Sequence, residues 1–362
     1  MNNFKKVGLT ALAGSLVAVS AHAGELTVTG GANITLKHGN ASSTSNVSGR
    51  GIGTDKDVAF KGTGELDNGT TFTVFTATTD TQGDLTSGYI SIATPSFGSF
   101  LMGHHSGAAH YKYDEEVPQV YEQISDITST VTQNKVGDFM DNNHITYTSP
   151  TFEVGGASIS FDLGYASDAN DVETGDGGTP GEQSTYGTGQ EAGVTVSYDA
   201  LKFGIYGAER QNKTKTAATA DNVQDEFNGV WYVKYSMGPV SVGYSEFYVD
   251  SGVSGTAVAT DSPKTLRTSH GLYEGHQMGI AFNVNENFSI SYTESEETYD
   301  AQSNNSSGTE TADVDQEIDA IQFAYSMGGM SVKAYQMDVT NPAFDEDADD
   351  SKVTEIALGL AF

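Results

Sequence analysis

The feature that most constrains this chain is an alternation of apolar or aromatic residues with small or polar ones, which recurs about every 20 residues. From 158 to 165, apolar residues fall on one face, and serine, aspartate and glycine fall on the other. The segments 277–282 and 288–293 repeat the pattern. Such alternation is typical of a β-strand with one apolar face. The chain is therefore expected to be an all-β protein.

Short turns alternate with long polar segments between these strands. The short turns, rich in glycine, asparagine, aspartate and proline, are expected at 67–69, 95–98, 150–155, 199–200, 238–239, 285–287 and 328–329. The long segments lie near 38–56, 80–86, 104–141, 167–187, 211–225, 250–269, 299–314 and 341–350. These fifteen connections predict sixteen strands, with both termini on the side of the short turns.

Membrane physics explains why such strands would close on themselves. Every backbone polar group in hydrocarbon must be hydrogen-bonded, so a sheet spans a bilayer only as a closed barrel. No apolar stretch after residue 23 is long enough for a spanning helix, which excludes a helical membrane protein. We therefore predict a 16-stranded antiparallel transmembrane β-barrel over residues 24–362.

Residues 1–23 are predicted to be a cleaved secretory signal peptide. Lys5 and Lys6 precede an apolar run from 7 to 19, and Ala21-His22-Ala23 has the small-x-small pattern of a cleavage site. The run is shorter than the roughly 20 residues that a membrane-spanning helix needs. The sequence thus predicts export, with the mature chain beginning at Gly24.

The charge balance excludes nucleic acid as a partner. The formal net charge is −31, and the chain has only three arginines. Phosphate binding requires clustered lysine and arginine side chains, which this composition does not supply. The chain has no cysteine, which is compatible with an oxidising compartment.

The C-terminus supplies a family resemblance. Ile356, Leu358, Leu360 and the terminal Phe362 alternate with Glu355, Ala357, Gly359 and Ala361. This ending resembles that of the Gram-negative general porins, in which a last strand with terminal phenylalanine is read by the outer-membrane assembly machinery. The resemblance implies an outer-membrane location and an assembly signal at Phe362.

Three internal motifs extend the resemblance over nearly the whole mature chain. The stretch 60–69 (FKGTGELDNG) looks like the second strand and first turn of the family. The stretch 97–107 (FGSFLMGHHSG) looks like the strand that enters the long third loop, and 141–150 (DNNHITYTSP) looks like the strand that leaves it. The resemblance implies a homotrimer, passive diffusion of small polar solutes and ions, and contact with outer-membrane lipid and lipopolysaccharide.

The third loop is the expected constriction. A 16-stranded barrel is wide enough to leave an aqueous lumen, and in porins this loop folds inward. By resemblance, the segment 106–140 narrows the pore, and its carboxylates favour cations or zwitterions because a narrow passage focuses their field. The alternative is that these acids only solvate an exposed loop. The acids are Asp114, Glu115, Glu116, Glu122, Asp126 and Asp138.

The opposing wall departs from the arginine ladder usual in the family. His104 stands where the strand entering the loop would present arginine, and Asp141 stands near another expected basic position. Lys37 and Lys61 are the lumen-facing candidates, with Lys234 and Lys333 further round the barrel. This weak basic ladder argues against a preference for anions.

Other functions remain open at this stage. A substrate-selective porin for a cationic or zwitterionic nutrient shares the fold, and a non-conducting adhesin or structural barrel would have a plugged lumen. An enzyme would need a Ser-His-acid constellation that His144 and His276 do not form in evident register. The histidines near the third loop lack metal-ligand spacing, so we expect neither a metal nor a cofactor.

Overall fold

The computed structural model describes residues 24–39, 49–78, 85–104, 106–114, 116–127, 133–141, 143–169, 186–213, 223–252, 271–300, 313–346 and 348–361. Residues 1–23 and Phe362 lie outside this part, so the signal peptide and the assembly signal stay predictions. No described helix is long and apolar enough to cross a membrane.

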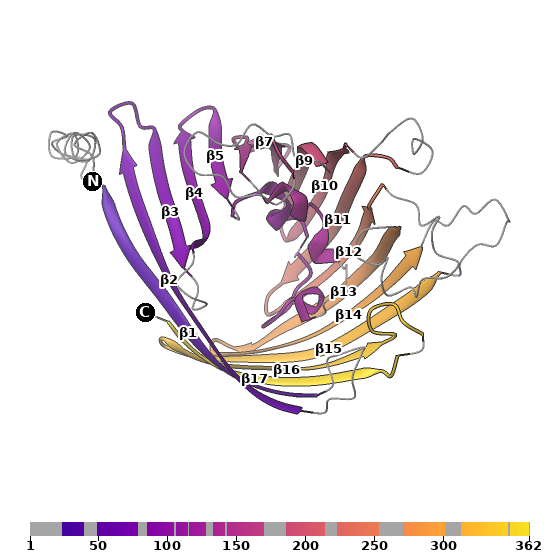
Figure 1. The fold of residues 1–362 in the computed structure, drawn as a ribbon. Helices are drawn as coiled ribbons and strands as arrows, with labels where there is room; N and C mark the ends of the chain where they lie inside the picture. Colours follow the sequence, from indigo (N-terminus) through magenta and orange to yellow (C-terminus); the bar gives the residue numbers. More distant parts are fainter. Residues whose placement is uncertain are drawn as a thin grey trace, which may run out of the picture.

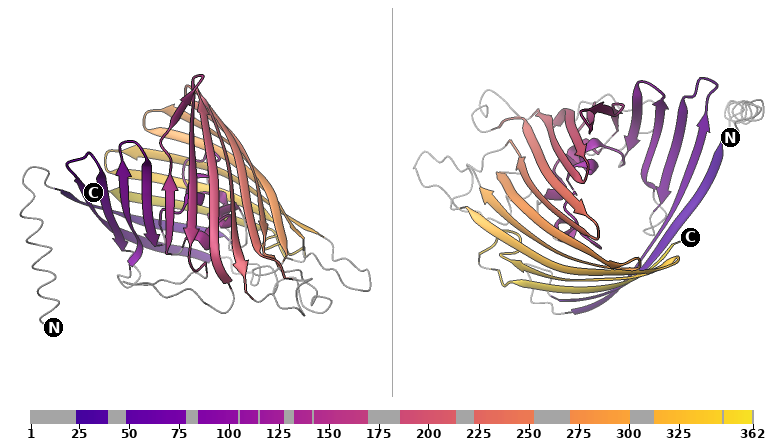
Figure 2. Two further views of the ribbon diagram at one scale, coloured as in Figure 1. Left: turned by 90° about the horizontal axis from the view of Figure 1, so that it is seen from above. Right: turned by 180° about the vertical axis from the view of Figure 1, so that it is seen from behind.

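The strands form one antiparallel sheet that closes on itself, because β1 pairs with both β2 and β17. Figures 1 and 2 show the ring from three sides. The strands are β1 (Glu25–Gly39), β2 (Gly49–Glu65), β3 (Thr71–Thr78), β4 (Leu85–Thr94), β5 (Gly98–His104), β6 (His144–Thr148), β7 (Phe152–Val154), β8 (Ala157–Ala166), β9 (Tyr186–Tyr198), β10 (Leu201–Asn212), β11 (Glu226–Met237), β12 (Val240–Asp250), β13 (Leu272–Asn285), β14 (Phe288–Asp300), β15 (Val314–Met327), β16 (Met330–Thr340) and β17 (Ser351–Ala361).

β6 and β7 together make one strand of the barrel, since both pair with β8 along the same edge. Pro150 cannot donate to the ladder, and the strand is interrupted there. Ser149 bridges the break: its backbone N–H donates to the Phe161 carbonyl (2.9 Å), and its Oγ accepts from the Phe161 N–H (3.0 Å). The predicted sixteen-stranded barrel is confirmed.

The tight turn expected at 150–155 lies further along, at Gly155-Gly156. Both glycines have left-handed backbone angles, with φ of 61° and 87°, as a two-residue hairpin turn requires. The other six short turns fall between consecutive strands where they were predicted. Pro150 therefore marks an interruption within a barrel strand, and the hairpin turn follows at Gly155-Gly156.

The two faces of the sheet differ as a transmembrane barrel demands. Outward side chains are apolar and exposed, as at Ile280 (45% exposed) and Ile321 (60%). Inward neighbours are polar and buried, as at Gln277 and Gln322 (both 1%). The alternation read from the sequence therefore separates an outer apolar face from an inner polar one.

The apolar band ends abruptly on the side of the long loops. There Tyr292 donates its hydroxyl to Asp319 (2.5 Å), and Tyr244 and Trp231 both donate to Glu246 (2.7 and 3.0 Å). Amphipathic rings with hydrogen-bonded polar tips are typical of the membrane interface. This row marks the external edge of the bilayer on β11–β15.

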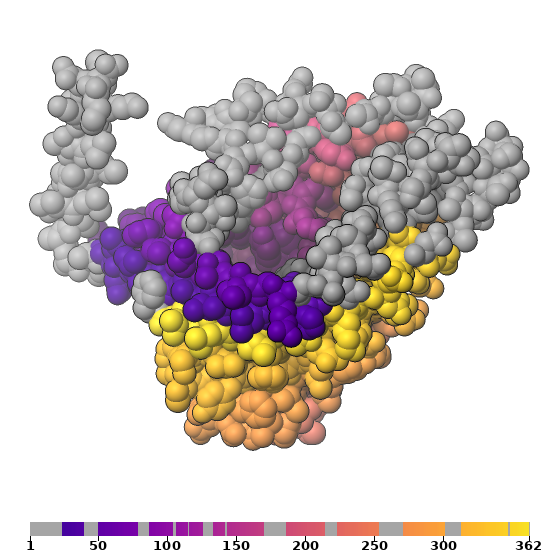
Figure 3. All heavy atoms as spheres, turned by 60° about the horizontal axis from the view of Figure 1, so that its bottom comes forward, coloured from indigo at the N-terminus to yellow at the C-terminus, as the bar shows by residue number. Residues whose placement is uncertain are grey.

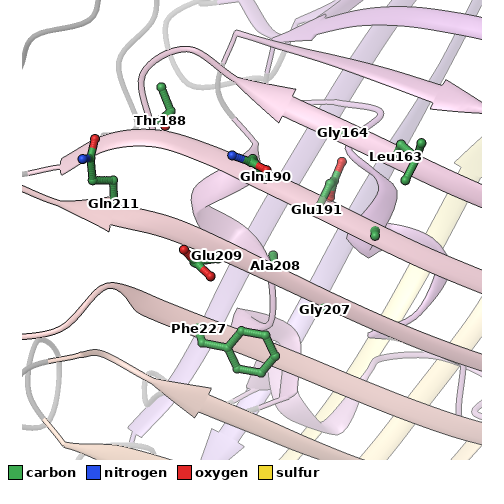
Figure 4. A pocket seen from close by; sticks show the side chains of 11 residues that line it. Leu163, Gly164, Thr188, Gln190, Glu191, Gly207, Ala208, Glu209, Gln211 and Phe227 are labelled. Atoms are coloured by element: carbon green, nitrogen blue, oxygen red, sulfur yellow. The ribbon is translucent and has the colours of Figure 1, made fainter.

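The outer wall also carries a shallow pocket of about 600 Å³ over β8–β11 (Figure 4). Small outward residues such as Ala192 and Gly207 form part of its lining, together with the outward side chains of Gln190, Glu209 and Phe227. The lining also includes Gly164, Glu191 and Ala208, which lie at inner-face positions of the same strands.

The assignment of faces predicts how the barrel responds to a charge. Ile280→Arg, in the middle of the outer band of β13, should destabilise the barrel in a bilayer and lower its free energy of unfolding by about 2–4 kcal/mol. Ala281→Arg, on the inner face between Ser241 and Ser291, should cost much less. Urea unfolding in lipid vesicles, followed by the fluorescence of the single tryptophan Trp231, measures both. Equal costs would contradict the assignment.

Candidate pore constriction

The segment between β5 and β6, residues 105–143, contains four short 3₁₀ helices: η1 (Ala109–Lys112), η2 (Ile124–Ile127), η3 (Gln133–Lys135) and η4 (Asp138–Met140). Figure 1 draws them in magenta within the ring of strands, and in Figure 3 purple and magenta atoms lie behind the indigo strands. We call this segment the third loop. Its contacts with the wall can be followed from β8 to β17.

The root of the third loop binds carboxylates of β8 and β9. Lys112 pairs with Asp162 (2.5 Å), which also accepts the hydroxyl of Tyr113 (2.8 Å). Glu191 accepts the backbone N–H of Ala109 (3.0 Å). Both wall carboxylates are buried, at 2% and 4% exposed. Buried carboxylates need such donors, so these contacts fix the start of the loop on the inner wall.

Glu116 anchors the next part of the loop to β10 and β11. Its carboxylate pairs with Lys202 (2.5 Å) and with Lys234, one lysine on each oxygen. Partial burial raises the pKa of Glu116, but the hydrogen bonds and charges of the two lysines lower it overall. The carboxylate is therefore ionised at neutral pH, and the cluster of Glu116, Lys202 and Lys234 carries a net positive charge.

The next part of the loop contacts β15 and β17, further along the same sheet. The backbone N–H groups of Tyr121 and Glu122 both donate to Gln322 Oε1 on β15 (2.9 and 3.1 Å). The hydroxyl of Tyr121 donates to Glu355 on β17 (2.7 Å). Lys333 lies 5.2 Å from the centroid of the Tyr121 ring, within the range of a cation–π contact.

On its return the loop is held by further inward side chains. Gln133 accepts a hydrogen bond from Ser245 on β12 (2.7 Å), and Asn228 on β11 accepts the N–H of Gly137 (3.1 Å). Arg210 lies 5.0 Å from the ring centroid of Phe139. The return path thus contacts the same half of the barrel as the outward path.

Glycines on the inner face of the wall allow the loop backbone to approach the sheet closely. A Cβ at Gly243 would lie 2.4 Å from Pro118 Cδ, and one at Gly279 would lie 2.8 Å from the Pro118 carbonyl oxygen. Real Cβ atoms do not approach so closely. A side chain at either position would displace the loop backbone.

The predicted acids of the third loop occupy different environments. Asp114 is buried (2% exposed), Glu116 is held by two lysines, and Asp138 is exposed and pairs with Lys135 (3.1 Å). Glu122 is half-buried, beside Gln322. Glu115 and the side chain of Asp126 lie outside the described part of the structure. The acids therefore do not form a single charged cluster.

The four residues predicted to lie on the pore wall also have different environments. Lys37 lies opposite Glu355 in the register, on the face opposite to exposed Leu36, and Lys61 shares this inner face. Asp141 is buried and accepts the hydroxyl of Tyr111 (2.7 Å). His104 is the last residue of β5; its side chain is outside the described atoms, so its place on the wall stays a prediction.

Sequence reasoning missed several residues that position the third loop. Lys202, Asp162, Glu191 and Glu355 are inward, and each bonds to the loop. For Lys202 the signal was available, because it alternates with the outward residues at 201 and 203. The third-loop partners of these wall residues could not be predicted, because the two residues of each contact are 50 to 234 positions apart in the sequence.

His110 is buried in η1, 1% exposed, and its ring lies 4.1 Å from that of Tyr111. Burial, and secondarily the charge of His144, lower the pKa of His110 to about 3. No group of three or more His, Asp or Glu side chains among the described residues could hold a metal ion. His110 is thus held uncharged within the third loop.

The strands close into a barrel, and the third loop is hydrogen-bonded to inward side chains of that barrel. A model of the Gram-negative porin family matches residues 8–361. The chain therefore belongs to the Gram-negative porins, and its location is the outer membrane. Porins are typically non-enzymatic channels for passive diffusion. The chain matches no curated protein sequence.

Solved structures share the fold at low sequence identity. Salmonella typhi OmpF in complex with daunomycin is 15% identical, with 93% of this chain and 97% of that chain covered and a TM-score of 0.64. In-vitro folded OmpT of Vibrio cholerae is 11% identical over 95% and 99%, with a TM-score of 0.62. The anion-selective porin from Comamonas acidovorans is 13% identical over 94% and 100%, with a TM-score of 0.59.

The buried imidazole of His110 predicts that docking of the third loop depends on pH. An undocked His110 would titrate near 6.5, so a fall in pH below 6.5 favours undocking until about pH 3. At pH 5 the docked loop should lose about 2 kcal/mol of stability. His110→Phe removes this contribution and leaves the nearby Asp114, Asp141 and His144 unchanged.

Limited proteolysis of the third loop at pH 7 and pH 5 provides the measurement. The native protein should be cleaved faster at pH 5, and His110→Phe should show a smaller acceleration. The same acceleration in both proteins would assign the pH response to the other groups and remove His110 from it.

Proposed function

We propose that this porin forms a water-filled channel for small polar solutes and ions, with the third loop folded inward as its constriction. The observation that carries the proposal is the line of hydrogen bonds from the third loop to inward side chains of β8 through β17, ending at the Tyr121–Glu355 contact. These contacts extend over β8 to β17, which leaves the lumen beside β1–β4 as the solute path.

The wall of this path carries charges of both signs. By alternation, Lys37, Lys61, Asp55 and Asp57 share the inner face of β1 and β2. Inward rings of Phe75 and Tyr89 stack on the neighbouring strands, with centroids 5.0 Å apart. Mixed charges beside a polar loop suit hydrated ions and small polar molecules.

We further propose that the channel prefers cations. On the described inner wall the inward bases are outnumbered by acids, which include Asp55, Asp57, Asp162, Glu191, Glu226, Glu297 and Glu355. The third loop adds further negative charge. Its acids outnumber Lys112 and Lys135. The field of this excess charge extends into a narrow lumen, where screening is weaker than in bulk water.

The outer surface supports two further parts of the proposal. The apolar outer wall suits association as a homotrimer, the form named for a structure of Vibrio cholerae OmpT. The exposed acids above the apolar band suit contact with lipopolysaccharide through cations. A signal peptide at 1–23 and a terminal assembly signal at Phe362 complete the proposed route to the outer membrane.

Two opposite substitutions of the Glu116 cluster test the role of the third loop in selectivity. Glu116→Gln leaves Lys202 and Lys234 unbalanced, so the ratio of cation to anion permeability should fall. The double variant Lys202→Gln and Lys234→Gln removes positive charge, so the ratio should rise. Single-channel reversal potentials in a planar bilayer under a salt gradient measure both.

The pair of variants separates charge from anchoring. Both variants break the same ion pairs, so an effect that came only from a loosened loop would have the same sign in both. Opposite shifts support the proposed constriction. Unchanged selectivity in both would contradict the placement of this cluster beside the ion path.

A further inference from the structure

A second external loop also binds the inner side of the wall. Phe344, in the loop 341–350 between β16 and β17, is fully buried, and its ring centroid lies 5.4 Å from that of Tyr273 and 6.0 Å from that of Tyr299. Both tyrosines are buried and alternate with exposed or half-exposed residues such as Glu274. The loop, which we call the eighth loop, thus passes β15 on the lumen side and reaches β13 and β14.

Hydrogen bonds tie the eighth loop to the same inner face. The backbone N–H of Ala343 donates to Gln316 Oε1 (2.8 Å), and Gln316 Nε2 donates to Glu297 (2.9 Å). Ser295 donates to the other oxygen of Glu297 (2.9 Å). Gln316 and Glu297 are completely buried. A wall network that includes a buried carboxylate therefore ends in the backbone of the loop.

The backbone of the eighth loop is held in an unfavourable conformation. Asn341, Ala343 and Phe344 have φ values of 49°, 60° and 52°. Residues other than glycine rarely adopt this left-handed region, and such strain persists only where the surroundings impose it. Burial of the Phe344 ring is the contact that can impose it here. The Phe344 ring, together with the hydrogen bond from Ala343 to Gln316, thus docks a loop whose backbone is strained.

The docked ring also joins the third loop. Phe344, Tyr273 and Tyr299 belong to one contiguous buried apolar cluster with Phe139 and Met140 of the third loop. The two loops therefore share a packed core inside the barrel. Movement of the eighth loop would remove apolar contacts from the edge of this core.

Anchoring by Phe344 fixes the position of a charged stretch. Glu346, Asp349 and Asp350 are exposed, while Asp347 lies outside the described residues. Glu346, Asp349 and Asp350 lie between the docked Phe344 and the start of β17, so the chain is held on both sides of them. Their carboxylates stay beside the external entrance.

We propose that the eighth loop, docked inside the barrel by Phe344, is a second selectivity element that narrows the external mouth and presents carboxylates to entering ions. This inference rests on the proposed channel function. Small cations and zwitterions are the solutes it favours, since the fixed carboxylates raise the local concentration of cations. The third loop then acts on solutes that the eighth loop has admitted.

Truncation of the anchor tests the docking. Phe344→Ala should release the loop, so the single-channel conductance and current noise should rise and the reversal potential should move toward zero. Phe344→Leu keeps an apolar side chain and should stay close to the native protein. Phe323→Ala, which removes the same ring from the outer face of β15, is the matched control and should change neither quantity.

Neutralisation of the acids tests selectivity with the loop still docked. Glu346→Gln, Asp349→Asn and Asp350→Asn together should move the reversal potential toward zero with a small change in conductance. The control is Glu274→Gln, Glu296→Gln and Glu317→Gln, which removes three exposed charges from the outer face of the barrel and should have little effect.

The outcomes separate this inference from the function on which it rests. If the native protein conducts but Phe344→Ala has native conductance and noise, the docked element is refuted and the channel stands. If both acid variants shift the reversal potential equally, the carboxylates act only through the surface potential and the selectivity role is refuted. Absence of conductance from the folded native protein refutes the channel and the inference together.

Discussion

The pairing of β1 with β17 is the interaction on which the rest of the structure depends. Nine residues of β1, from Gly31 to Gly39, pair with β17, and this ladder leaves the sheet without a free edge. In hydrocarbon an unpaired edge would expose a row of backbone groups at a cost of several kcal/mol each. Closure allows apolar side chains to cover the outer face and polar side chains to fill the inner one.

Closure also leaves space inside the barrel, and the third loop contacts the inner wall that borders this space. Sixteen strands enclose more space than wall side chains can fill. The loop binds the wall mainly through carboxylates and lysines, such as Asp162 with Lys112 and Glu116 with Lys202. Inner glycines at 243 and 279 let its backbone approach the sheet. In the proposed function, these same contacts set both the position and the charge of the third loop.

The sequence predicted the barrel well because strand periodicity and turn residues are local signals. Lys37, Lys61 and Lys234 lie at inner-face register positions, and their role in a pore wall stays a prediction. The turn near Pro150 was misplaced, since proline can interrupt a strand as well as end it. The wall position of His104 stays a prediction, since its side chain is outside the described atoms.

The electrostatics of the third loop could not be predicted in the same way. A run of acids at 114–116 suggested a uniformly negative constriction, but Asp114 is buried and Glu116 is bound by two lysines from β10 and β11. Those pairs join residues 86 and 118 positions apart. Net charge is a property of the sequence, whereas the charge that faces a lumen depends on contacts that only the folded barrel defines.

The most direct test of the central claim, a water-filled barrel narrowed by its third loop, is the single-channel conductance of the purified protein with neutral polymers of graded size. The account predicts steady conductance, reduced by small polymers that enter the constriction and unaffected by larger ones that the third loop excludes. A folded barrel that does not conduct, or one that admits polymers as large as an unobstructed sixteen-stranded lumen would, contradicts it.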